Sequence, residues 1–171
     1  MAETMKTYAV LLVDDEPNIV NALKRSLGDE GYDISVAHSG QEALELLKSR
    51  KIDLVVSDQI MPGMTGVELL KLVRLRYPDI ARVMLTGNAN LNMAAEAINY
   101  GEVDRMLVKP WDEAELKFSL QLSLEQMELK KQQRLLLAKM QGQGGELGEL
   151  ERSYPGISSL DRDLDGNILL E

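Results

Sequence analysis

Five short apolar segments alternate with segments of helical periodicity, and this alternation constrains the fold more than any other feature of the chain. The apolar segments are too short to be helices, and their near-continuous apolar character is typical of strands covered on both faces. We predict strands at Tyr8–Val13, Tyr32–Ala37, Ile52–Ser57, Ile80–Leu85 and Val103–Val108.

Helical spacing of apolar residues predicts a helix after each strand. These helices are expected from Pro17 to near Gly31, at Gly40–Ser49, at Gly66–Tyr77, at Leu91–Tyr100, and from Asp112 to about Met140. Neighbouring parallel strands need right-handed helical crossovers, so the pattern predicts a doubly wound α/β fold with a five-stranded parallel sheet and an extended C-terminal helix. Ligands of such sheets bind beyond the carboxyl ends of the strands.

Polar residues end four of the five predicted strands. They are Asp14 and Asp15, Asp58, Thr86 and Lys109. Any one of these residues alone would be read as a helix cap or a solvated loop residue. Together at one sheet edge, three carboxylates repel one another and attract a hard divalent cation such as Mg²⁺. A lysine and a hydroxyl beside them suit phosphoryl transfer, with Asp58 as the nucleophile.

The chain resembles the receiver family of bacterial two-component response regulators. The matching stretches are LLVDDEP (11–17), VVSDQIMPGMTGVELL (55–70), VMLTGNA (83–89) and MLVKPWDEAEL (106–116). The resemblance implies a flavodoxin-like strand order 2-1-3-4-5 and a cis Lys109–Pro110 peptide bond. It implies these roles: Asp58 as phosphoacceptor, Asp14, Asp15, Asp58 and the Ile60 carbonyl as Mg²⁺ ligands, Lys109 as the phosphate-contacting lysine, and Thr86 as the switch hydroxyl.

Two positions depart from the usual family pattern. Met106 stands where the family usually has an aromatic residue that swings inward when the switch hydroxyl moves. Methionine is flexible and can repack there. Ile60 stands two residues after Asp58, where a polar side chain could orient attacking water. We therefore expect an aspartyl phosphate that persists rather than one hydrolysed within seconds.

The family implies a cytoplasmic signalling protein that is not an enzyme beyond its own phosphotransfer and autodephosphorylation. Its phosphodonor would be a sensor histidine kinase or a phosphotransfer protein. Phosphorylation would switch binding of a downstream protein through the face formed by the fourth helix, fifth strand and fifth helix, and through the long C-terminal helix. The LTG and KPW variants also resemble receivers of hydrogenase-type regulators and of regulators linked to cyclic-dinucleotide phosphodiesterases. Trp111 is expected to anchor the last helix by packing.

Charge and composition exclude several other classes. The formal net charge is −9 and no segment is densely basic, so we expect no direct binding of nucleic acid. The chain has no cysteine, which excludes disulfides and thiolate metal sites. No signal peptide is evident, the early apolar run is too short to span a bilayer, and no membrane association is expected.

The C-terminal third extends beyond a normal receiver. We divide the chain into a receiver domain (1–124), an extended signalling or dimerisation helix (125–141) and a flexible acidic tail (142–171). Leu122, Leu129 and Leu136 repeat every seven residues, and Leu120 and Met127 form a second such register. The helix either lies on its own domain or pairs two protomers, and we favour a homodimer. A short hairpin turning at Asp165–Gly166 is preferred in the tail over a calcium-binding loop.

Three alternatives belong to other classes of protein. A receiver-fold scaffold that works without phosphorylation is the main one, although the intact acid cluster argues against it. A phosphatase or other enzyme lacks an additional acid–base residue. A flavin or nucleotide binder lacks its glycine-rich phosphate loop.

Overall fold

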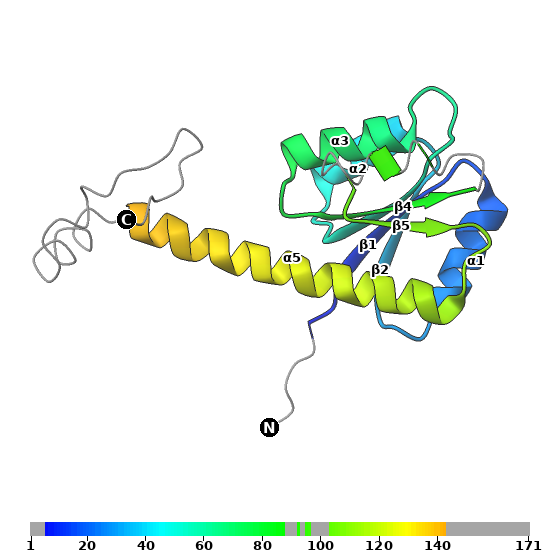
Figure 1. Ribbon diagram of the computed structural model, residues 1–171. Coiled ribbons are helices and arrows are strands. Elements are labelled where there is room, and N and C mark those ends of the chain that lie inside the picture. The colour runs from blue at the N-terminus through cyan, green and yellow to red at the C-terminus, as the bar shows by residue number, and fades with distance from the viewer. Residues whose placement is uncertain (1–5, 88–91, 93–94, 97–102, 143–171) are drawn as a thin grey trace, which may run out of the picture. The chain divides into compact units, whose positions relative to one another are not determined.

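A single parallel sheet forms the centre of the chain in the computed structural model (Figure 1), which describes residues 6–87, 92, 95–96 and 103–142. Its strands are β1 (Ala9–Val13), β2 (Asp33–Ala37), β3 (Leu54–Asp58), β4 (Ala81–Thr86) and β5 (Arg105–Val108). Their order is β2-β1-β3-β4-β5, and every neighbouring pair is parallel. The predicted fold class and strand order are therefore confirmed.

Four helices connect or follow these strands within the described residues. They are α1 (Pro17–Leu27), α2 (Gly40–Ser49), α3 (Gly66–Arg76) and α5 (Glu113–Gly142). The helix predicted at Leu91–Tyr100 lies outside the described residues, apart from Asn92, Ala95 and Glu96, which are helical. The predicted hairpin in the tail also lies outside them. The predicted strands begin one or two residues before the observed ones. Side chains such as Ile52 are already buried there, although the hydrogen-bonded pairing with the neighbouring strand starts later, at Leu54 in β3.

Helices cover both faces of the sheet, and each face has its own apolar core. Leu11, Val55 and Met84 pack toward α2 and α3 on one side, with Val73 among their neighbours. On the other side, the alternate strand residues pack toward α1 and the first turns of α5. Figure 1 shows α2 and α3 on one side of the sheet and α1 on the other. Burial on both faces explains why the strands are continuously apolar.

Local signals in the sequence fix the starts of the helices. Pro17 occupies the first turn of α1, where its missing N–H has no helical partner to lose. Thr65 and Glu68 form a reciprocal capping box at the start of α3. Asp112 starts α5, because its carboxylate accepts a hydrogen bond from the backbone N–H of Glu115 at 3.3 Å. These caps set where each loop at the carboxyl edge of the sheet ends.

The first half of α5 packs on the sheet. Leu116, Leu120, Leu124 and Met127 are all buried there. Trp111 packs against the same core and donates its indole N–H to Ser26 Oγ at 3.2 Å, as expected of an anchor for this helix. The register of Leu120 and Met127 therefore faces the helix's own domain.

Beyond Met127, the large apolar side chains of α5 are exposed. They are Leu129, Leu135, Leu136, Leu137 and Met140. The chain separates into two compact units, Met1–Leu129 and Lys130–Glu171. The narrower division predicted above, at 124/125 and 141/142, stays a prediction. Among the residues described, no helix combines the length and apolarity that crossing a bilayer needs.

Candidate functional site

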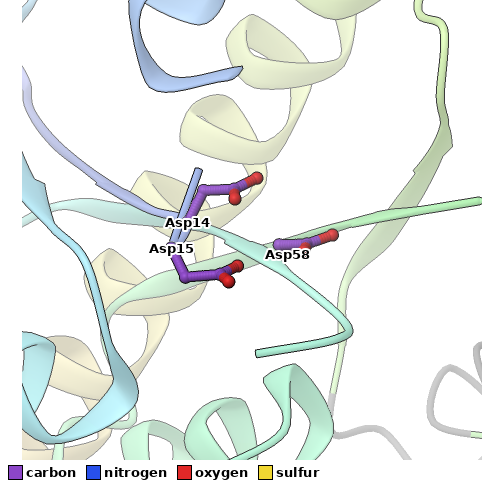
Figure 2. A group of neighbouring side chains, drawn as sticks. All are labelled: Asp14, Asp15 and Asp58. Carbon is purple, nitrogen blue, oxygen red and sulfur yellow. The ribbon is translucent and has the colours of Figure 1, made fainter. Parts of the chain in front are cut away.

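Three aspartates meet at the carboxyl edge of the sheet, at the ends of the neighbouring strands β1 and β3. Asp14 and Asp15 follow β1, and Asp58 is the last residue of β3 (Figure 2). One carboxylate oxygen from each lies within 4.8 Å of the others. Asp14 is fully buried and Asp58 is 7% exposed, whereas Asp15 reaches the surface. Such a close set of acids requires a positive charge to balance it.

Lys109 supplies part of that charge. Its ammonium lies 2.9 Å from Asp58 Oδ1 and 3.3 Å from Asp14 Oδ2. Lys109 follows β5, and its backbone N–H donates to the carbonyl of Thr86 at the end of β4 at 2.8 Å. The side chain thus reaches from the edge strand to the acids of β1 and β3. The peptide bond between Lys109 and Pro110 is cis, as the resemblance predicted.

Burial and charge shift the two innermost groups. Burial raises the pKa of the Asp14 carboxyl, the charge of Asp58 raises it further, and a backbone N–H from Glu16 together with Lys109 partly offsets the rise. Burial lowers the pKa of the Lys109 ammonium, but its hydrogen bonds and charge interactions with Asp58 and Asp14 outweigh this, so the net shift is upward. Lys109 is therefore held as a cation between the two carboxylates.

An open depression of about 580 Å³ lies over these groups. It is lined by Asp15, Glu16, Asp58, Gln59, Ile60, Met61, Pro62, Gly87 and Lys109. The donor set fits Mg²⁺, which prefers carboxylate and carbonyl oxygens and keeps several waters in an open site. Asp15 and Asp58 face the depression, and Asp14 lies behind them. The three carboxylates and one ammonium carry a formal charge of −2, the complement of a divalent cation.

The remaining predicted site residues lie around this centre. Thr86 ends β4 and is fully buried, and its hydroxyl donates to the carbonyl of Gly87 at 3.1 Å. Met106 lies on β5, pairs with Met84, and packs half-buried against the core under α2 and α3. Ile60 lines the depression with its side chain 62% exposed. The structure thus places an apolar side chain at the rim of the site.

Gln59 is a site residue that the sequence did not reveal. It is 2% exposed, and its side-chain oxygen accepts the backbone N–H of Val67 in the first turn of α3 at 3.0 Å. A single glutamine after a strand has no periodicity or charge pattern to mark it as buried. Its contact depends on how α3 packs, which local sequence does not encode.

A doubly wound sheet with an acid cluster and a lysine at its carboxyl edge defines a receiver-type signalling domain. The protein-family model described as response regulator receiver domain matches residues 10–121. The chain belongs to this family, and it carries the receiver domain of a two-component response regulator.

Individual relatives agree with this assignment. The chain is similar to the hydrogenase transcriptional regulatory protein HoxA of Cupriavidus necator, with 38% identity over 106 residues, 62% of this chain and 22% of the relative. It is also similar to the solved signal receiver domain of an HD domain-containing protein from Pseudomonas fluorescens Pf-5, with 37% identity, a TM-score of 0.71, and coverage of 77% and 97%. A solved structure titled adenylate cyclase from Rhodopirellula baltica gives 36% identity, a TM-score of 0.74, and coverage of 78% and 99%.

The chain spans only 22% to 29% of the length of the curated relatives that it matches. The similarity therefore concerns their receiver portions. The subgroup suggested by the LTG and KPW variants has counterparts here, because one relative is a hydrogenase regulator and one solved neighbour comes from an HD domain-containing protein.

Proposed function

We propose that Asp58 accepts a phosphoryl group from a sensor histidine kinase or a phosphotransfer protein, and that the resulting charge switches protein–protein interaction in the cytoplasm. The observation that carries the proposal is the geometry around Asp58. Its carboxylate lies within 4.8 Å of those of Asp14 and Asp15, and 2.9 Å from the Lys109 ammonium. Phosphoryl transfer depends mainly on positioning and on neutralising charge, and these residues supply both.

Asp58 is the nucleophile in the proposed reaction. One carboxylate oxygen of Asp58 attacks the phosphorus of a phosphohistidine, the phosphorus–nitrogen bond breaks, and the imidazole leaves with its electron pair. Lys109 neutralises charge on the transferred group. Asp14, Asp15, Asp58 and the Ile60 carbonyl would hold Mg²⁺, which supplies further neutralisation when bound. Thr86 would rotate its hydroxyl from the Gly87 carbonyl to a phosphoryl oxygen.

Phosphorylation of the isolated chain tests this role. We expect incubation with a small phosphodonor and Mg²⁺ to add one phosphoryl group, detected by intact mass, and Asp58→Asn to add none. Chelation of Mg²⁺ should also prevent the addition. Asp53→Asn is a matched control, because Asp53 is equally buried at the opposite end of β3 and accepts the backbone N–H of Ala9. Wild-type protein that remains unmodified would contradict the proposal.

The proposed output runs through the face of the fourth helix, β5 and α5. Met106 lies half-buried on β5, and flexible methionine can repack when the Thr86 hydroxyl moves. A downstream protein partner would read the change, and no direct nucleic-acid binding is proposed. If a beryllofluoride phosphate mimic alters neither spectra nor oligomeric state, the phosphorylation-independent scaffold becomes the better description.

The second half of α5 would pair two copies of the chain. Leu129 and Leu136 are 65% and 63% exposed, and they continue the seven-residue repeat of Leu122. Glu125 and Lys130 flank this repeat five residues apart, the spacing at which opposite charges meet across a parallel, in-register helix pair. An antiparallel pair would lose this match. The charge pattern therefore supports a second, parallel copy as the partner.

A further inference from the structure

Gln59 makes three hydrogen bonds, one to β4 and two to the first turn of α3. Its backbone N–H donates to Leu85 on β4 at 3.0 Å, and its carbonyl accepts the N–H of Gly66 at 2.9 Å. Its side-chain oxygen accepts the N–H of Val67 at 3.0 Å. With only 2% of its surface exposed, the side chain has no freedom to leave this position.

Three residues, Gln59, Thr65 and Glu68, satisfy the free N–H groups at the start of α3. Its first four N–H groups have no partner within the helix and need one outside it. Gln59 accepts those of Gly66 and Val67, the Thr65 hydroxyl accepts that of Glu68, and the Glu68 carboxylate accepts that of Thr65. The Gln59 cap and the Thr65–Glu68 capping box differ in their position in the chain. Thr65 is the residue next to the helix, whereas Gln59 lies across the loop beside Asp58.

The hydrogen bonds of Gln59 therefore close the loop 60–65 at its base. This loop carries Ile60, whose carbonyl is the proposed backbone ligand of the metal. The closure is tight, because a Cβ on Gly66 would lie 2.2 Å from the carbonyl oxygen of Asp58. A loop held at both ends keeps its carbonyl in place before the cation arrives, and such preorganisation raises affinity.

We infer that Gln59 is a positioning residue for the metal half of the site, acting through the backbone of the loop that follows it. This inference rests on the proposed metal site. Loss of the side-chain acceptor leaves the Val67 N–H without its partner and frees the base of the loop, so Mg²⁺ must then order the loop when it binds. A helix cap with no such role would affect folding stability alone.

Mg²⁺ titration of the whole chain by calorimetry tests the inference, with thermal unfolding measured in parallel. Gln59→Met keeps the length of the side chain and removes the acceptor. We expect it to raise the Mg²⁺ dissociation constant about tenfold, equal to about 1.4 kcal/mol. Gln59→Glu retains an acceptor oxygen and should bind Mg²⁺ at least as tightly as wild type. Thr65→Val, the matched control, removes the other cap and should lower Tm without changing the dissociation constant.

Each outcome decides between positioning and capping. If Gln59→Met lowers Tm but binds Mg²⁺ like wild type, Gln59 is a cap only and the inference is wrong. Equal loss of affinity in Thr65→Val would also overturn it, because any fraying of α3 would then suffice. If wild type binds no Mg²⁺, the proposed metal site itself fails, and the inference fails with it.

Discussion

Asp58 and Ile60 are two residues apart, yet the first side chain is buried and the second is exposed. Asp58 is 7% exposed and its carboxylate lies 2.9 Å from the Lys109 ammonium, so its orientation is fixed. Ile60 is 62% exposed at the rim of the same depression. An exposed branched alkyl group cannot accept a proton from water or orient it. If Asp58 accepts a phosphoryl group as proposed, residue 60 offers no polar side chain to help water remove it.

The first prediction concerns the lifetime of the phosphate. We expect the wild-type aspartyl phosphate to persist well beyond seconds without a phosphatase, and Ile60→Asn to speed its loss about tenfold, equal to about 1.4 kcal/mol of activation free energy. The decay can be followed by intact mass after removal of the phosphodonor. Leu75→Asn, which changes a leucine 69% exposed on α3 in the same way, should leave the rate unchanged. Rapid loss from wild type would sink the idea.

The second prediction concerns Tyr32, whose phenol packs against the core under α1 and α5. Burial, assisted by the charge of Glu30, raises its pKa to about 12. Because the folded pKa exceeds the unfolded value of about 10, the corresponding stability is fully present below pH ~10 and is lost as pH rises through ~12. In urea unfolding between these values, Tyr32→Phe should lose stability less steeply than wild type. Equal slopes would show that the buried phenol does not couple to folding.

At the scale of an element, the start of α3 is closely packed against the end of β3. Gly66 opens the helix, is buried, and lies against the backbone of Asp58. A side chain there would meet a carbonyl oxygen at 2.2 Å and the Cα of Gln59 at 2.9 Å. Both are backbone atoms, so neither can rotate away, and either α3 or the end of β3 must move.

The third prediction follows from this contact. Gly66→Ala should destabilise the protein by about 1–3 kcal/mol, the usual range for overpacking, and should slow phosphorylation of Asp58. Gly28→Ala is the matched control: its φ is −58° and its new Cβ would meet helix oxygens at 3.5 and 3.6 Å. There the substitution should be neutral or stabilise by up to about 1 kcal/mol. Urea unfolding measures both. Equal free energies of unfolding for the two variants would show that α3 can move away from β3 at no cost in stability.

The sequence predicted the strands from their apolar character, and it predicted the site from the polar residues at the strand ends. Asp14, Asp58 and Lys109 could be brought together on paper because the carboxyl ends of parallel strands share one edge. Gln59 and Gly66 could not, since their roles depend on how closely α3 approaches β3. The direction of the Thr86 hydroxyl, now toward Gly87, is likewise a matter of local packing.

At the scale of the whole molecule, α5 belongs to two environments. Its buried apolar residues, of which Met127 is the last, pack on the sheet, and Glu128 forms an ion pair with Lys6 near the first strand. The large apolar residues of α5 after this point are exposed. The sequence showed two seven-residue registers but could not tell them apart, because only the packed domain determines which one is used internally. Leu120 and Met127 are buried, whereas Leu129 and Leu136 are exposed.

The fourth prediction is that these exposed leucines pair two chains and that phosphorylation strengthens the pairing. Mass in solution, measured by light scattering with and without a beryllofluoride mimic, should show a dimer for wild type and a shift toward monomer for Leu136→Glu. Leu75→Glu places the same charge on an equally exposed leucine of α3 and should leave the mass unchanged. A partner that docks elsewhere on the domain would not respond to Leu136.

Charge-reversal variants of α5 distinguish a parallel from an antiparallel pair. In a parallel, in-register pair, Glu125 of one copy faces Lys130 of the other, so Glu125→Lys places like charges together and should weaken the dimer by a few tenths of a kcal/mol to about 1 kcal/mol. The double variant with Lys130→Glu restores opposite charges and should recover wild-type dimerisation. Because exposed ion pairs are screened by ions, the difference should shrink at high salt. Weakening that the double variant fails to repair would exclude the parallel register, while Leu136 would still report whether the helices pair at all.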